Sequence, residues 1–289
     1  MTSRSVVVII PTKDESVHVA RCITSVAGMW PIVVIDGGST DDTVQIARKL
    51  KANVLEHRWT GYADQKNWAL DNLPVRSDWV LFLDADEQLT AELRDEILQA
   101  VGDETATGFA IPRRYVFLGR PLRHAWWYPD YQLRLFRVGR GRFEERHVHE
   151  HVVLDGRLRH LRHALIHENL KGLSAFVERH NRYSDLEAAE RLTPSLGRTI
   201  GSFTGSRANR RRALKERVWY RLPCRPAIRF LWLYVVKRGF LDGRRGLLFC
   251  RLIAHYELLI DAKVLERQLS ADERVSCGNF SVTCSHHDS

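Results

Sequence analysis

Residues 79–87 read WVLFLDADE, an apolar run that ends directly in three acidic side chains. The run predicts a buried strand, and Asp84 and Asp86 follow its carboxyl end, where open α/β sheets bind their ligands. Two carboxylates at this spacing can reach one site, and their repulsion is costly unless a cation neutralises it. Carboxylate oxygens favour Mg²⁺ or Mn²⁺, which commonly hold a diphosphate. A solvated turn before a helix would carry the same pattern, so both interpretations stay open here.

Two earlier strand ends offer polar groups to the same edge of the expected sheet. Residues 5–10 (SVVVII) and 31–36 (PIVVID) are β-branched runs typical of buried parallel strands. The first run leads into Thr12 and the second ends at Asp36. Residues 37–42 (GGSTDD) predict a tight turn with helix caps that does not need the carboxylate of Asp36. Together, the three strand ends predict a nucleotide site.

Strands alternate with helical spacing over the first hundred residues. We expect a short strand at residues 54–55 and helices at residues 15–28, 41–50, 62–72 and 90–101. This alternation predicts an α/β fold with a parallel sheet and right-handed crossovers. No strand is followed by G-x-G-x-x-G or G-x-x-x-x-G-K-[ST], so the dinucleotide-binding and P-loop classes lack their phosphate cradle.

The pattern changes after residue 105. Short runs at residues 108–112, 132–138 and 152–154 predict antiparallel additions to the sheet. Residues 194–212 show little periodicity and predict a linker, and the tail after Ala271 is expected to be disordered. The remaining segments predict helices at residues 172–192, 225–238 and 246–266. We therefore expect a core at 1–170, a basic helical region at 171–270 and a disordered tail at 271–289.

The positive charge is concentrated in one segment. The chain has 289 residues, 44% hydrophobic and 27% charged, which is ordinary for a folded protein, and its net charge is +9. Residues 205–251 hold fourteen Lys and Arg against two acids, so the whole excess lies there. With its Trp and Tyr residues, this segment favours an anionic membrane surface as partner. It could instead bind the phosphates of a lipid-linked acceptor or be a solvated helical face; nucleic acid is not expected, because no binding module is present.

Cysteine usage and the apolar segments bear on the compartment. The five cysteines are irregularly spaced, which argues against a disulfide framework and fits a reducing compartment. The N-terminal apolar run is expected to be a strand and not a signal peptide. The apolar run at residues 230–236 is too short to span a bilayer. We expect a cytoplasmic protein, peripheral on the inner face of a bacterial cytoplasmic membrane.

Several motifs in combination resemble inverting family 2 glycosyltransferases of the GT-A fold. They are residues 9–15 (IIPTKDE), 35–43 (IDGGSTDDT), 66–67 (KN) and 83–87 (LDADE). More loosely, residues 128–137 (YPDYQLRLFR), 148–150 (VHE) and 239–243 (GFLDG) resemble the subgroup that contains lipopolysaccharide core β-1,4-glucosyltransferases. One departure is that residues 13–15 read Lys-Asp-Glu where many members have Asn-Glu.

The resemblance implies a GT-A-type open, mostly parallel sheet with flanking helices, here followed by a basic helical appendage. It also implies a site for the nucleotide-sugar donor, built from Pro11, Thr12, Glu15, Asp36, Lys66, Asn67, Asp84 and Asp86. Asp36 would contact the base and Asp84 the ribose or sugar. Asp86 would coordinate a Mg²⁺ or Mn²⁺ ion that bridges the diphosphate.

Direct displacement at the anomeric carbon also needs a base for the acceptor hydroxyl. The candidates are Glu150, favoured because related His-Glu motifs point toward the acceptor, and Asp130, which could instead orient Arg134. Both could equally be surface ion pairs with nearby arginines.

Histidines and aromatic residues gather in the same region. Residues 147, 149, 151, 160, 163 and 167 are all His. They could form a zinc site, or His149 could be an extra ligand of the donor metal, but such histidines more often bond carboxylates. Residues 126–128 (WWY) could stack on a sugar ring or belong to the core.

Taken together, these features predict a transferase that moves sugar from a UDP-sugar to a lipopolysaccharide core or another lipid-linked glycan. Two alternatives stay open. One is a polyprenyl-phosphate glycosyltransferase, and the other is a non-catalytic adaptor that binds anionic membrane or nucleic acid. The sequence does not indicate which sugar is transferred.

Overall fold

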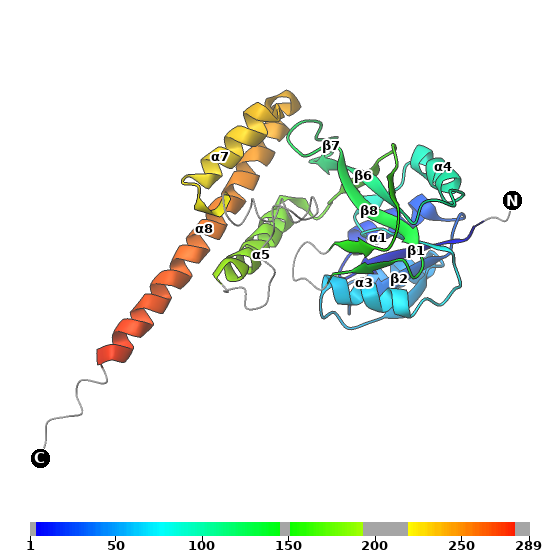
Figure 1. The fold of residues 1–289 in the computed structure, drawn as a ribbon, viewed down its shortest axis with the longest axis horizontal. Helices are drawn as coiled ribbons and strands as arrows, with labels where there is room; N and C mark the ends of the chain where they lie inside the picture. The colour runs from blue at the N-terminus through cyan, green and yellow to red at the C-terminus, as the bar shows by residue number, and fades with distance from the viewer. Residues whose placement is uncertain (1–3, 145–150, 193–218, 281–289) are drawn as a thin grey trace, which may run out of the picture. The chain divides into compact units, whose positions relative to one another are not determined.

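The computed structural model describes residues 4–144, 151–192 and 219–280. The chain divides into two compact units, residues 1–172 and 173–289 (Figure 1), where a boundary at residue 170 was expected. The expected linker at 194–212 lies outside the described residues. No helix in the described ranges is both long and apolar enough to pass through a membrane.

The first unit is built on one curved sheet. Its strand order is β3-β2-β1-β4-β8-β6-β12-β5, and β7 and β11 also pair with β6. The strands are β1 (Val6–Thr12), β2 (Ile32–Asp36), β3 (Asn53–Glu56), β4 (Trp79–Phe82), β5 (Glu87–Gln88), β6 (Gly108–Phe117), β7 (Arg120–Pro121), β8 (Asp130–Arg137), β11 (Leu158–His160) and β12 (Leu165–Glu168). A separate two-stranded sheet pairs β9 (Gly141–Phe143) with β10 (Val152–Leu154). The predicted fold class, α/β with an open and mostly parallel sheet, is confirmed.

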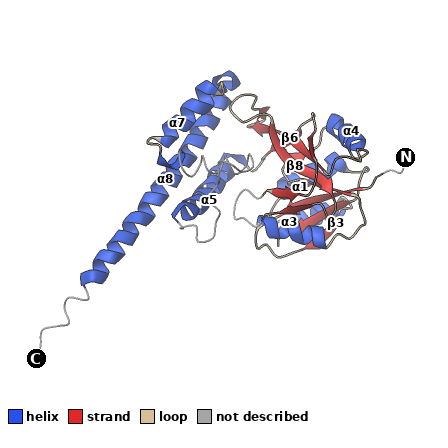
Figure 2. Ribbon diagram, in the orientation of Figure 1, coloured by secondary structure: helices blue, strands red, loops and turns tan. Residues whose placement is uncertain are grey.

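Helices cover the sheet on both sides (Figure 2). They are α1 (Ser16–Val26), α2 (Thr43–Lys49), α3 (Tyr62–Asp71) and α4 (Ala91–Ala100), which confirms the four predicted helices. Successive residues of β1 point to opposite faces, as the period of a strand requires. Val6, Val8 and Ile10 join the core with α1 and α4, whereas Val7 and Ile9 join the core with α3.

Two of the three expected antiparallel additions to the sheet, at residues 108–112 and 132–138, are present, whereas residues 152–154 form β10 of the separate two-stranded sheet. β8 runs antiparallel to both β4 and β6. The prediction ended the β6 strand at Pro112, but the strand continues to Phe117 because β12 pairs with its second half. This β12 strand was not predicted, and it returns the chain to the edge where Asp84 and Asp86 lie.

The second unit is helical. It contains α5 (Gly172–Leu192), η1 (Trp219–Arg221), α7 (Arg225–Leu231), the π-helix η2 (Trp232–Val236), the 3₁₀-helix η3 (Gly239–Asp242) and α8 (Gly243–Phe280). α5 packs on α8 through Ala188, Ile260 and Val264. A disordered tail was expected after Ala271, and α8 extends to Phe280. Residues 281–289 lie outside the described ranges.

Candidate functional site

Three strand ends meet at one edge of the sheet, as predicted. Thr12 at the end of β1 is paired in register with Asp36 at the end of β2. On the other side of β1, Phe82 of β4 lies opposite Ile9, so Asp84 follows two residues later at the same edge. The parallel direction of these strands therefore places Asp36 and Asp84 on either side of Thr12.

The carboxylate of Asp36 organises the turn that follows it. Asp36 is buried, and its Oδ2 accepts hydrogen bonds from the backbone N–H groups of Gly38 (3.0 Å) and Ser39 (2.8 Å). The expectation that this turn does not need Asp36 is therefore wrong. A Cβ at Gly37 would lie 3.2 Å from the carbonyl oxygen of Thr12, so the turn also needs a residue without a side chain there. The result is a fixed loop of backbone beside the first strand end.

Asp84 is neutralised by protein side chains. The guanidinium of Arg134 bonds its carboxylate, and Lys66 Nζ lies 3.6 Å from its Oδ1. Burial opposes ionisation of Asp84, but the charges of Arg134 and Lys66 outweigh it and hold the pKa of this carboxyl well below its usual range. Asp84 is therefore a fixed anion that does not need a metal ion to offset it.

Glu87 supports this arrangement from beneath. Its side chain has no exposed surface, its Oε1 lies 2.7 Å from Arg134 Nη2, and its Oε2 accepts the backbone N–H of Asp84. Burial raises the pKa of Glu87, and Arg134 only partly offsets that effect. The same burial acts to lower the pKa of Arg134, but Asp84 and Glu87 together raise it. The sequence analysis gave Glu87 no role and suggested Asp130 as the partner of Arg134. The position of Glu87, directly after the D-x-D pair, was the one feature that could have indicated its role.

Asp86 lies in a different environment. Its Oδ1 is 3.4 Å from Nδ1 of His167, and Asn169 Nδ2 is 3.5 Å from its Oδ2. His167 is buried, and its Nδ1 makes no hydrogen bond within the described residues. A carboxylate oxygen beside an imidazole nitrogen is a donor set that suits Mn²⁺ or another divalent ion. The described ranges contain no group of three or more His, Cys, Asp and Glu arranged to hold a metal, so further ligands would come from a bound molecule or water.

Other predicted donor residues already have protein partners. Glu15 contacts His18 Nδ1 at 2.6 Å and Lys171 Nζ at 2.8 Å. The amide of Asn67 pairs with both backbone groups of Phe143, each at 2.9 Å. Its side chain therefore attaches β9 to α3, whereas the neighbouring Lys66 faces Asp84.

Of the two candidate bases, only Asp130 lies within the described residues. Glu150 lies outside the described residues, together with His147 and His149. Both Nε and Nη2 of Arg113 donate to Asp130 Oδ2, at 3.1 and 2.7 Å. The expectation that Asp130 orients Arg134 is wrong, because Arg134 is held by Asp84 and Glu87 instead.

An aromatic series runs outward from His167. Tyr115 stacks on His167 with ring centroids 5.0 Å apart, Trp126 packs on Tyr115 at 5.5 Å, and Trp127 packs edge-on against Trp126 at 5.4 Å. Trp127 and Tyr128 are 37% and 44% exposed. Trp126 is therefore the inner member of the three, and the next two offer their rings to solvent.

Three of the described histidines, at positions 160, 163 and 167, have separate partners. His163 pairs with Glu96 at 3.0 Å, and His160 packs on Tyr131. His167 alone among these three contacts Asp86. The zinc-site hypothesis thus finds no support in the described part of the chain.

Comparisons with known proteins point to one family. Residues 7–153 match the model of glycosyl transferase family 2. Over 94% of its length the chain is 27% identical to an uncharacterized glycosyltransferase of Rickettsia typhi, of which 91% is covered. Over 88% of its length it is 28% identical to the lipopolysaccharide core biosynthesis glycosyltransferase LpsC of Rhizobium meliloti, of which 89% is covered. A stretch of 87 residues, 30% of each chain, is 53% identical to an uncharacterized glycosyltransferase of Rickettsia conorii.

A TarS structure is among the solved structures that align over most of the chain. Staphylococcus aureus TarS 1–349 in complex with UDP-GlcNAc is 15% identical, with 95% of this chain and 92% of that chain covered and a TM-score of 0.45.

Proposed function

Since the chain belongs to glycosyl transferase family 2 and is a glycosyltransferase, we propose that it transfers a sugar from a UDP-sugar, with inversion, to a lipopolysaccharide core or another lipid-linked glycan. The observation that carries the proposal is the different treatment of two neighbouring carboxylates. Asp84 is neutralised by Arg134 and Lys66, whereas Asp86 faces the buried Nδ1 of His167. This separation suits a donor site in which one carboxylate binds sugar hydroxyls and the other binds a metal.

The nucleoside end of the donor would lie against the first two strand ends. Pro11 and Thr12 form the end of β1. The turn that Asp36 holds in place has a backbone that a ligand could approach closely. Glu15 would border this end at the start of α1. Asp36 and Asp84 would then receive the base and the ribose or sugar, because protein partners hold both carboxylates in place before any ligand arrives.

Asp86 and His167 are the residues that would hold Mg²⁺ or Mn²⁺. When bound, such an ion stabilises negative charge on a leaving diphosphate. Lys66 lies beside Asp84 and adds a second positive charge on the same side of the site. Lys66 would, together with a bound metal ion, offset the negative charge of a departing diphosphate.

The acceptor hydroxyl must lose its proton on the face opposite the leaving group. We keep Glu150 as the proposed base. Asp130, the alternative, already accepts two hydrogen bonds from Arg113, and Arg113 Nη1 lies 4.0 Å from Glu87. Those contacts favour a positioning role for Asp130.

The acceptor would approach over the exposed aromatic rings. Trp127 lies at the outer end of the series that starts at the proposed metal ligand His167, and the exposed Tyr128 follows it in the chain. Sugar rings stack on exposed aromatic faces through their apolar C–H groups. Similarity to LpsC over most of the chain supports a lipopolysaccharide core as acceptor class. The basic segment at 205–251 supports peripheral binding to the inner face of the cytoplasmic membrane.

The test is metal-dependent UDP release. UDP-sugars would be supplied singly with bacterial lipid extract, with and without Mn²⁺, to the wild type, to Asp86→Asn and to the exposed control Asp95→Asn. We expect release that needs Mn²⁺ and extract, falls at least about 100-fold in Asp86→Asn and is unchanged in Asp95→Asn.

The negative outcomes separate the alternatives. Release with GDP- or dTDP-sugars alone would contradict the UDP donor. Transfer to added polyprenyl phosphate in preference to core oligosaccharide would identify the polyprenyl-phosphate reaction. A folded protein that releases no nucleotide from any donor would leave the adaptor.

A further inference from the structure

Six large apolar side chains close together in the sequence are exposed in the helical unit. Each has 45–57% of its surface accessible, and we call this surface the apolar tip: Leu231, Trp232, Val235, Val236, Phe240 and Leu241. Fully burying one such side chain is worth about 1.5–3 kcal/mol, so their exposure in water forgoes a large stabilisation. Contiguous exposed apolar surface of this kind marks an interaction site in a soluble protein.

The tip faces outward because the opposite side of the same helix is used for packing. Arg225, Arg229 and Leu233 recur every four residues; Arg225 and Leu233 are buried, and both arginines pair with acids of α8. Arg225 bonds Asp261, and Arg229 Nη2 lies 2.7 Å from Glu257 Oε1. These contacts fix the rotation of α7 and η2 about their axis, and the tip residues occupy the remaining side.

The tip is a single ordered surface. The ring of Tyr234 stacks on Phe230 with centroids 5.3 Å apart and meets Phe240 edge-on at 6.2 Å. The backbone N–H of Lys237 donates to the carbonyl of Trp232 at 2.8 Å, which closes the wide π-turn. Aromatic packing therefore joins η2 to η3, and the apolar residues of both lie on one rigid piece.

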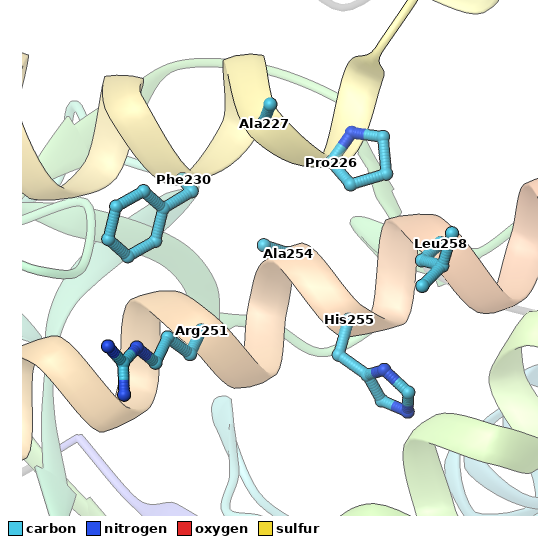
Figure 3. A pocket seen from close by; sticks show the side chains of 7 residues that line it. All are labelled: Pro226, Ala227, Phe230, Arg251, Ala254, His255 and Leu258. Carbon is cyan, nitrogen blue, oxygen red and sulfur yellow. The ribbon is translucent and has the colours of Figure 1, made fainter.

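A groove adjoins the tip between α7 and α8. It has a volume of about 470 Å³, and Figure 3 shows Phe230 projecting from α7 toward Arg251 of α8. Its lining is mostly apolar, with Arg251 and His255 as the polar members. Because Phe230 also stacks on Tyr234, the groove continues the apolar surface of the tip.

Cations border the tip without carboxylate partners. Between residues 225 and 251 the sequence has seven basic residues and one acid, Asp242. Among the described residues, no carboxylate forms an ion pair with Lys237, Arg238 or Arg244, whereas Arg225 and Arg229 are paired. Exposed apolar side chains flanked by unpaired cations are the signature of a segment that lies in an anionic membrane interface.

We propose that the apolar tip inserts into the headgroup and acyl boundary of an anionic bilayer, with Lys237, Arg238 and Arg244 at the level of the lipid phosphates. This proposal specifies which surface makes the membrane association proposed above. It rests on the proposed function only for the location of the protein at a membrane. A bilayer fits better than a second copy of the chain, because a two-fold contact through this surface would bring like cations together. The groove beside Phe230 gives room for an acyl chain at the edge of the inserted surface.

Vesicle sedimentation of the full chain tests the proposal. Phosphatidylglycerol–phosphatidylcholine vesicles and pure phosphatidylcholine vesicles would be compared for the wild type, a Trp232→Glu/Val235→Glu double variant and Arg238→Glu. We expect the double variant to lose at least about tenfold in affinity for the anionic vesicles. Arg238→Glu should also lose about tenfold there, with little change on neutral vesicles.

The matched control is Leu265→Glu, which alters an equally exposed leucine of α8 outside the tip. It should bind as the wild type does, and thermal melting would verify that all variants fold. Wild-type binding by the double variant, or an equal loss in Leu265→Glu, would overturn the proposal. So would a dimer that the double variant dissociates, without vesicle binding. Vesicle binding needs no donor, so a protein that binds vesicles but releases no UDP would remove the proposed reaction and leave the tip intact.

Discussion

Arg134 and Glu87 form an ion pair closed off from solvent, with Arg134 Nη2 2.7 Å from Glu87 Oε1. Glu87 follows the D-x-D pair on the chain, and Arg134 comes from the antiparallel strand β8. Nη2 of Arg134 donates to both Glu87 and Asp84, and its Nη1 lies 3.4 Å from Asp84 Oδ1, so the guanidinium bridges the two carboxylates. The buried pair of Arg134 and Glu87 beneath the site thus determines the position and the charge of Asp84.

Removing Arg134 should therefore destabilise the fold. Arg134→Met leaves Glu87 and Asp84 close together without their shared cation, and breaking a buried pair in this way costs about 3–5 kcal/mol. The free energy of unfolding would be measured by urea titration. Arg142→Met is the matched control, since its pair with Asp71 is exposed and worth only about 0–1 kcal/mol. Equal losses in the two variants would contradict the structural role of the Arg134 pair.

Asn67→Ala should loosen the small sheet of β9 and β10. The substitution leaves the N–H and C=O of Phe143 without their side-chain partner, and each buried unsatisfied group costs about 1–3 kcal/mol. Urea titration should show a loss of at least about 2 kcal/mol. Asn72→Ala removes one exposed hydrogen bond to Trp68 and should have a small effect. If Asn67 instead served only the donor, its substitution would change catalysis and leave stability unaltered.

His167→Ala should weaken the response to metal. The Mn²⁺ concentration that half-activates UDP release should rise at least about tenfold, because one of two protein donors is lost. At saturating Mn²⁺ the KM for the UDP-sugar should change much less. His163→Ala, which removes the pair with Glu96, is the control. An unchanged Mn²⁺ dependence in His167→Ala would exclude this residue as a ligand.

Trp127→Ala should affect the acceptor and not the donor. Loss of one aromatic stacking partner is worth about 0.5–1.5 kcal/mol, which corresponds to a roughly 2- to 10-fold rise in the acceptor KM. The slow donor hydrolysis without acceptor should be unchanged, and Trp127→Phe should restore most of the acceptor effect. A change in donor hydrolysis of the same size would show that Trp127 supports the site as a whole.

Asp41 should make stability sensitive to acid. Burial acts to raise its pKa, but hydrogen bonds from Thr43 and Ser16 outweigh it and lower the pKa to about 2. A lowered folded-state pKa gives stability that is present above pH ~4 and is lost as pH falls toward 2. The difference in unfolding free energy between wild type and Asp41→Asn should therefore shrink by roughly half from pH 5 to pH 3. A difference that is constant over this range would contradict the assignment.

Local patterns were enough to predict the parallel half of the sheet. The β-branched runs ending at Thr12, Asp36 and Phe82 mark their own strands, and chain direction alone brings their ends together. Asp36, Asp84 and Asp86 were therefore predictable as neighbours from the order of the residues alone. The glycosyltransferase family was predictable for the same reason, since its motifs lie at these ends.

The partners of those carboxylates were not predictable. Arg134 lies fifty residues after Asp84, and His167 lies eighty-one residues after Asp86. Their positions depend on the register of β8 and on the pairing of β12 with both β5 and β6. Neither the register nor the pairing produces a recognisable periodicity or spacing in the sequence. The six histidines and the many arginines were therefore equally plausible partners of the carboxylates. The exposure of the apolar tip was also not predictable from the sequence, because it depends on which arginines pair with α8.

The neutralisation of Asp84 by Arg134 and Lys66 has a consequence for the stability of the metal-free protein. A site whose central anion is balanced by its own cations does not need a resident ion to stay folded. Treatment with a chelator should therefore leave the melting temperature unchanged while it abolishes turnover, in contrast to structural metal centres, which unfold when stripped. The site without an ion would then be a stable resting form of the protein.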